Sequence, residues 1–347
     1  MTTTTAPTPP DAAIARRPAA IRVAWLAAGV AALVVAAGLS CAIGTRVVSP
    51  EEIVAGLLGD TDTVGAAAVA ARIPRTVLAI LVGAALALSG TTLQAVTRNP
   101  LADPGILGLS MGASLAVVTA MAFLGVMHPI AVLVVAVVGS AAAGVLVYAI
   151  GSLGRDGATP LKLALAGAAT TAALGSLVNA VTLPRAQELT AFRFWQIGGV
   201  GGAAWDRIAL IVPALAAGAL LVLALARGMN ALALGDDVAA GLGEHVGRTR
   251  AISAAGAVVL CGAATAIAGP IGFVGLVVPH LCRLLVGTDH RWLLPFSAVA
   301  GATLLTVADV VGRVIARPDE VEVGIVTALI GAPVFIAIVR RRKVREL

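Results

Sequence analysis

Long apolar stretches, separated by short breaks that contain proline or charged residues, run through almost the whole chain. A helix of about 20 apolar residues is long enough to cross the hydrocarbon core of a membrane. The pattern predicts ten such helices with loosely defined ends, of which the eighth is short and interrupted by proline: 23–44, 74–96, 105–124, 129–150, 161–182, 205–226, 251–268, 271–287, 292–313 and 323–339.

Composition supports an all-α polytopic membrane protein. Hydrophobic residues make up 59% of the 347 residues, charged residues only 12%, and the mean hydropathy is +1.00. A soluble domain of this size could not bury that much apolar surface. A β-barrel is also disfavoured, because its strands alternate apolar and polar residues whereas the apolar runs here are continuous. The abundance of alanine and glycine is typical of membrane helices that pack closely through small residues.

The basic residues indicate a topology. If the N-terminus is cytoplasmic, 16 of the 24 lysines and arginines lie on the cytoplasmic side, as the positive-inside rule expects. We therefore expect both termini in the cytoplasm, with a disordered tail over 1–22, a transmembrane domain over 23–340 and a basic tail over 341–347. The net charge of +6 then needs no nucleic-acid partner.

Several kinds of chemistry have no motif in this chain. The two lysines, Lys162 and Lys343, lie outside any glycine-rich phosphate loop, so ATP hydrolysis by that chemistry is not expected. No metal site, cofactor or catalytic pair is expected. An ion-coupled secondary transporter should carry acidic residues near mid-membrane, and none is convincingly placed there. Three cysteines within predicted spans are interpreted as small buried apolar side chains: Cys41, Cys261 and Cys282.

Charged residues mark the outer ends of two spans. Arg72 and Arg75 flank Pro74, a residue that favours a helix start. They are either snorkelling side chains at the interface or a site that captures carboxylates of a docking partner. Asp309 and Arg313 have the i, i+4 spacing of an ion pair, although ionisable groups at that depth also suggest a pathway or interface role.

Two cytoplasmic segments are candidates for a gate and a partner site. Asn99 follows the second span, either as a turn residue before Pro100 or as a polar side chain at an inner gate. In the long internal segment 226–250, Asp236 and Asp237 are expected to cap a short helix over 238–242. That helix is either an ordinary amphipathic connector or a handle for a soluble motor.

Four blocks of sequence, in order, resemble the signature blocks of the FecCD family of ABC-importer permeases: 72–114, 234–250, 268–295 and 324–339. The resemblance runs from about residue 25 to the C-terminus. It implies a type II importer fold in the plasma membrane, with a second permease (another copy or a paralogue), an ATPase pair and an extracytoplasmic binding protein. Ferric siderophores are the cargo it favours, with haem or vitamin B12 as the alternative.

The resemblance also implies site residues. It gives Arg72, Arg75 and Arg313 a role in binding-protein docking, Asn99 a role at the cytoplasmic gate, and Thr159, by a looser alignment, a role as gate partner. The residues implied in ATPase coupling are Leu234, Gly235, Asp236, Asp237, Ala240, Gly241, Leu242 and Gly243. The loop 318–324 departs from the family pattern, because Glu322 replaces a proline and adds negative charge near the docking arginines.

Overall fold

The computed structural model describes residues 18–153, 159–185, 187 and 189–343, and these residues form fourteen α-helices without a β-strand. The helices are α1 (Ala19–Ala42), α2 (Pro50–Leu57), α3 (Val64–Thr97), α4 (Leu109–Leu124), α5 (Pro129–Gly151), α6 (Pro160–Thr182), α7 (Thr190–Ile197), α8 (Trp205–Ala224), α9 (Ala226–Leu232), α10 (Asp236–Gly241), α11 (Val246–Ala268), α12 (Val274–Val286), α13 (His290–Ile315) and α14 (Val323–Lys343).

Ten of these helices correspond one to one to the predicted spans, which confirms the all-α polytopic fold. Seven are long and apolar enough to cross a membrane, and the shorter apolar helices are α4, α12 and the apolar part of α14. The eighth span is short, as expected: the 13 residues of α12 rise only about 20 Å. Two of the three cysteines, Cys261 and Cys282, are buried among apolar side chains.

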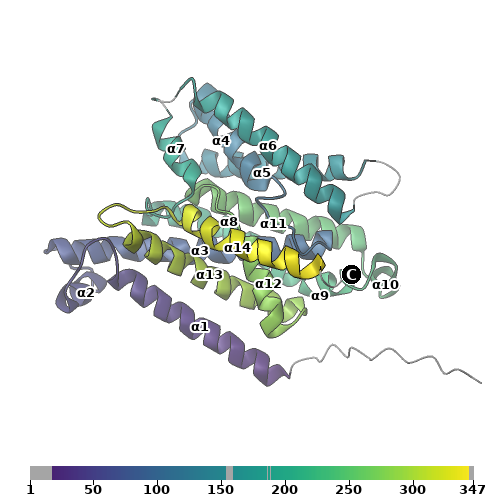
Figure 1. The fold of residues 1–347 in the computed structure, drawn as a ribbon, viewed down its shortest axis with the longest axis horizontal. Coiled ribbons are helices and arrows are strands. Elements are labelled where there is room, and N and C mark those ends of the chain that lie inside the picture. Colours follow the sequence, from purple (N-terminus) through teal and green to yellow (C-terminus); the bar gives the residue numbers. More distant parts are fainter. Residues whose placement is uncertain (1–17, 154–158, 186, 188, 344–347) are drawn as a thin grey trace, which may run out of the picture.

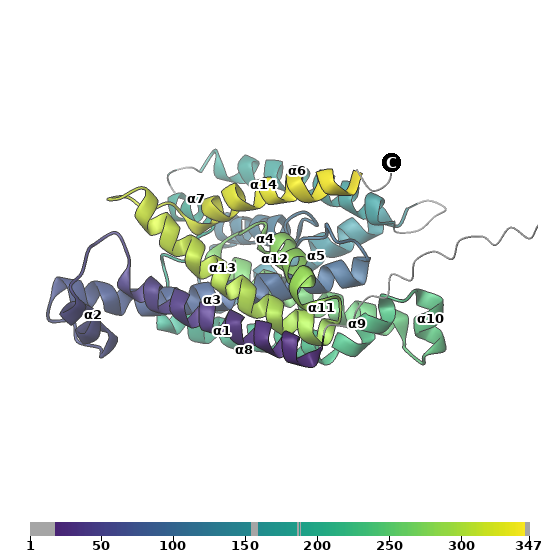
Figure 2. The same cartoon turned by 60° about the horizontal axis from the view of Figure 1, so that its bottom comes forward.

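The long helices lie side by side along one common direction (Figures 1 and 2). Helices α2 and α7 lie at one end of this bundle, called here the α2 end, and α9 and α10 lie at the other, called the α10 end. Helix α3 is the central element, since 78% of its most apolar stretch is buried, compared with 11% for α1. Residues at the two ends of α3 therefore belong to the most buried of the candidate membrane spans.

Small residues allow α3 to approach its neighbours at backbone distance. Gly83 crosses α13 at Gly301, and a Cβ atom on either glycine would overlap the backbone of the other. Further along α3, Gly90 lies against the backbone of Gly275 in the first turn of α12. The expected packing through small residues is confirmed at these crossings.

The ends of several helices differ from the prediction. Helix α3 begins at Val64, capped by the Thr63 hydroxyl, which accepts a hydrogen bond from the Ala66 amide at 3.1 Å. Pro74 thus lies inside α3 and does not start it, because an alanine-rich, capped turn precedes it. Helix α1 already begins at Ala19 and α14 continues to Lys343, so parts of both expected tails are helical; the rest of those tails, 1–17 and 344–347, lies outside the described residues.

Candidate functional site

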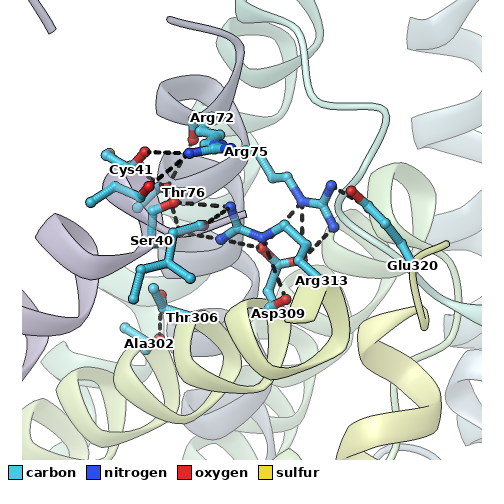
Figure 3. Close-up of polar contacts among 12 residues, drawn as sticks. Ser40, Cys41, Arg72, Arg75, Thr76, Ala302, Thr306, Asp309, Arg313 and Glu320 are labelled. Carbon is cyan, nitrogen blue, oxygen red and sulfur yellow. Dashed lines mark hydrogen bonds and ion pairs between the residues drawn. The ribbon is translucent and has the colours of Figure 1, made fainter. Parts of the chain in front are cut away.

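A cluster of charged side chains lies at the α2 end, where α3, α13 and the loop after α13 meet (Figure 3). We call it the arginine cluster; it consists of Arg72, Arg75, Asp309, Arg313 and Glu320. Three guanidinium groups and two carboxylates leave one net positive charge. The cluster thus has the electrostatic character of a site for an additional carboxylate.

Asp309 is the centre of the arginine cluster. Its carboxylate is 1% exposed and accepts hydrogen bonds from Arg75 Nε at 3.0 Å and Arg75 Nη2 at 2.8 Å. On its other side, Arg313 Nη2 lies 3.0 Å from Asp309 Oδ2, which confirms the predicted i, i+4 ion pair. One buried carboxylate therefore joins the guanidinium groups of two helices.

Arg72 and Arg313 also bind the C-terminal end of α1. The last carbonyl groups of a helix have no partners within it, and they carry partial negative charge. Arg72 Nη1 donates to the carbonyl of Ala42 at 2.8 Å and its Nη2 to that of Arg46 at 2.9 Å, while Arg313 Nη1 donates to that of Ser40 at 2.9 Å. The two guanidinium groups, 7% and 2% exposed as residues, are thus largely engaged inside the protein.

Arg75 is the arginine of this cluster that faces outward. Its Nη1 lies 2.7 Å from Glu320 Oε2, and the Glu320 side chain is 36% exposed. Arg72 and Arg75 therefore do not act as a pair: the first contacts α1, and the second contacts α13 and its following loop (Figure 3). Sequence reasoning missed Glu320, although three acidic residues within the loop 318–324 were a visible signal.

Glu322, the residue that replaces the proline of the family pattern, has different contacts from Glu320. Its carboxylate lies over the backbone of Gly199, where a Cβ atom would overlap it. Burial raises the pKa of Glu322, and the neighbouring carboxylates of Glu320 and Asp309 add to the increase while Arg75 opposes it. Of these two loop acids, Glu320 thus contacts the docking candidate Arg75 directly, whereas Glu322 packs against the loop after α7.

The two gate candidates lie at helix ends. Asn99 is 7% exposed, and its side-chain oxygen accepts a hydrogen bond from the Leu101 amide at 2.9 Å, the geometry of a turn residue. Thr159 is the N-cap of α6, with its hydroxyl accepting from the Lys162 amide at 3.3 Å. Both side chains thus have local structural partners, and a gate role remains a prediction.

The coupling candidates form a small exposed lobe around α10. Helix α10 covers Asp236–Gly241, slightly earlier than the expected 238–242, and its N-cap is Gly235 with a φ of +112°. The expected capping role of Asp236 and Asp237 is therefore wrong: both lie in the first turn. After the helix, Gly243 has a φ of +85°, a turn conformation that favours glycine, whereas Gly241 is still helical.

Large apolar side chains on this lobe are exposed to solvent. Leu234, Val238 and Leu242 are 62%, 51% and 68% exposed, and they recur every four residues. Several exposed apolar side chains close together in the chain, with acidic residues between them, are typical of a protein interaction site. At the start of α10, Asp236 binds Arg98 and also Arg250 Nη2 at 3.0 Å, two contacts that the sequence pattern did not suggest.

Comparison with known proteins identifies the chain. The model of the FecCD transport family matches residues 32–341. The probable siderophore transport system permease protein YfiZ of Bacillus subtilis is 46% identical over 78% of this chain and 81% of its own length. The ferric enterobactin transport system permease protein FepD of Escherichia coli is 42% identical over 89% of this chain and 93% of its own.

Relatives named for other cargoes match nearly as well, and a solved structure shares the fold. A hemin transport permease of Yersinia pestis is 40% identical over 78% of this chain, and a cobalamin import permease of Halobacterium salinarum is 43% identical over 80%. A metal-chelate type ABC transporter, solved in an inward-facing conformation, has a TM-score of 0.77 and 29% identity, covering 92% of this chain and 99% of its own. This chain therefore belongs to the FecCD transport family and is a permease subunit of an ABC importer in the plasma membrane.

Proposed function

We propose that this permease imports ferric siderophores. The observation that supports this cargo is that the relatives at 46% and 42% identity, YfiZ and FepD, are both named for siderophore transport. Haem or a corrinoid is the second candidate, supported by the relatives at 40% and 43% identity. The chain itself supplies the membrane path, and a separate ATPase supplies the energy.

Uptake into vesicles tests the cargo. The permease is reconstituted with its ATPase and its binding protein, and we expect ATP-dependent accumulation of iron from ferric enterobactin or a ferric hydroxamate. Haem and cyanocobalamin serve as matched competitors, which should leave iron uptake unchanged at equal concentration. Accumulation of haem or cobalamin in place of iron would overturn the proposed cargo and favour the second candidate.

We propose that the α10 end faces the cytoplasm and the α2 end faces outward. The positive-inside rule supports this orientation, since it puts both termini and most basic residues inside. It also puts the arginine cluster on the side from which a binding protein arrives. The proposed partners are accordingly that binding protein outside, an ATPase pair inside, and a second permease, either another copy or a paralogue.

The arginine cluster is the proposed docking site for a carboxylate of the binding protein, through Arg72, Arg75 and Arg313. Its net positive charge and its place at the α2 end support this role. Arg75 offers the outermost guanidinium, with a side chain that is 12% exposed. Arg72 and Arg313 are occupied by α1 carbonyl groups, so they contribute mainly charge and rigidity unless docking rearranges them.

Replacing Arg75 with glutamine is expected to weaken docking of the binding protein by at least about 30-fold, because loss of one partner of a charge pair costs about 2 kcal/mol or more. The measurement is binding of labelled binding protein to the permease–ATPase complex in nanodiscs. Arg207→Gln is the matched control, since Arg207 is an exposed arginine in the first turn of α8 at the same end. Equal affinities of both variants and wild type would refute a docking role for Arg75.

At the α10 end we propose that the segment 234–243 docks on the ATPase and that Asn99 and Thr159 form the inner gate. The exposed side chains of Leu234, Val238 and Leu242 support the first role, because an apolar surface at the end of a membrane bundle favours a protein partner. Burial of Asn99 immediately after the central helix supports the second. Transport then follows because the binding protein and the ATPase bind the two states of the gate with different affinities.

A further inference from the structure

Arg98 has an unusual backbone conformation at the α10 end. It is the C-cap of α3, with φ of +50° and ψ of +29°, in the left-handed region that residues with a side chain seldom adopt. Among the described residues, Phe273 is the other non-glycine residue with a positive φ. Arg98 directly precedes Asn99, so the conformation of Arg98 decides how the gate candidate leaves the helix.

The side chain of Arg98 reaches across to the coupling lobe. Its Nε donates to the carbonyl of Leu232 at 2.9 Å, and its Nη2 forms an ion pair with the carboxylate of Asp236. Leu232 ends α9 and is fully buried, whereas Asp236 begins α10. One guanidinium therefore connects the end of the central helix to both sides of the α9–α10 turn.

These contacts contribute little to stability. The Arg98 and Asp236 side chains are 37% and 48% exposed, and ion pairs that exposed are weak in water. Their value lies in geometry: the planar guanidinium donates from two nitrogens at fixed relative positions, Nε to a backbone carbonyl and Nη2 to a carboxylate, and the single nitrogen of a lysine does not reproduce this arrangement. A displacement of α10 that keeps the Asp236 ion pair therefore pulls on Arg98, the residue that precedes Asn99.

Arg250 provides a natural comparison. It also donates to Asp236, at 3.0 Å. However, it belongs to the first turns of α11 and is not adjacent in sequence to Asn99. The two arginines thus share one carboxylate, and only Arg98 joins it to the gate candidate. Their separate replacement distinguishes a link to the gate from simple support of α10.

We propose that Arg98 is the positioning residue that transmits movement of α10 to Asn99, and so couples the ATPase to the inner gate. This inference rests on the proposed function, in which the segment 234–243 docks on the ATPase. It adds a residue outside that segment and a defined route: from α10 through Asp236 to the guanidinium, and from there to the last turn of α3.

The test measures transport and ATP hydrolysis in the same vesicles, with the complete complex of permease, ATPase and binding protein and with ferric enterobactin as cargo. For Arg98→Gln we expect iron imported per ATP hydrolysed to fall at least fivefold, while hydrolysis stays within twofold of wild type. Arg250→Gln should keep the ratio within twofold of wild type. Arg98→Lys, which keeps the charge but has one donor nitrogen in place of two at fixed positions, should give a ratio between those of Arg98→Gln and wild type.

Three outcomes would overturn the proposal. The first is an unchanged ratio in Arg98→Gln, and the second is an equal fall in Arg98→Gln and Arg250→Gln, which would assign both arginines to the shape of α10. The third is loss of the ATPase from purified Arg98→Gln and Arg98→Lys complexes, which would make Arg98 an assembly residue. Failure of the proposed cargo is seen separately, because it appears in the wild-type complex; the same ratios are then measured with haem or cyanocobalamin.

Discussion

Replacing Gly90 with leucine is expected to prevent the permease from accumulating as a folded protein. Gly90 crosses the first turn of α12 so closely that even a Cβ atom would overlap the backbone of Gly275. Gly275 is itself tightly surrounded, since a Cβ atom there would meet Pro104, Asp103 and the backbone of Leu86 within about 3 Å. Gln94 adds a hydrogen bond to the Gly275 carbonyl at 3.1 Å, so the whole crossing would have to open.

The size of this effect follows from where the added atoms go. Overpacking a well-packed interior costs about 1–3 kcal/mol when side chains can adjust, and here backbone faces backbone, so relaxation requires movement of α3 itself. Total stabilities are only about 5–15 kcal/mol. The measurement is the yield of monodisperse protein on size-exclusion chromatography in detergent, followed by a thermal melt.

Gly38→Leu is the matched control for Gly90→Leu. Gly38 lies on an exposed face of α1, where a Cβ atom would meet nothing within 4 Å. The same change in volume and hydrophobicity should therefore leave yield and melting temperature unchanged. Gly90→Ala should fall between the two. Normal yield of Gly90→Leu would mean that α3 and α12 do not cross as described.

The transmembrane helices could be predicted from sequence because their signal is local. A run of apolar residues needs no partner to be recognised, so all ten appear within a few residues of their observed ends, except where charge interrupts them. Pro74 favours a helix start, so the sequence predicts the start of α3 near Pro74, whereas the helix begins at Val64. The short helices α2, α7 and α9 escaped prediction, since each covers only seven or eight residues.

The candidate sites could be predicted as residues but not as contacts. The ion pair of Asp309 and Arg313 was visible because both lie on one helix. The acceptors of Arg72 are backbone carbonyls at the end of another helix and in the segment that follows it, and backbone groups carry no sequence signal. Glu320 lies 245 residues from Arg75, a pairing that only the packing of α3 against α13 brings about.

These contacts give the arginine cluster a structural role in addition to the proposed docking role. Arg72 and Arg313 stabilise the C-terminal carbonyls of α1, a helix whose apolar surface is otherwise little buried. Asp309 in turn fixes Arg75 and Arg313. Removal of Asp309 therefore affects three helices at once, and it should be the most damaging single change of charge at this end.

Asp309→Ala is expected to destabilise the permease by about 3–5 kcal/mol, the cost of breaking a buried ion pair and leaving its partner uncompensated. Two guanidinium groups, with side chains 12% and 2% exposed, would then face each other without the intervening carboxylate. Melting temperature in detergent, with yield as a second measure, reports the loss.

Two variants separate charge from packing in this prediction. Asp309→Asn keeps the size of the side chain and removes only the charge, so it should be nearly as damaging as Asp309→Ala if repulsion between Arg75 and Arg313 is the cause. Asp319→Ala is the matched control, since Asp319 is an exposed aspartate in the following loop, and surface changes of this kind usually stay within about 0.5 kcal/mol. If Asp309→Asn melts like wild type while Asp309→Ala does not, lost packing and not unbalanced charge accounts for the effect, and the electrostatic interpretation of the arginine cluster is wrong.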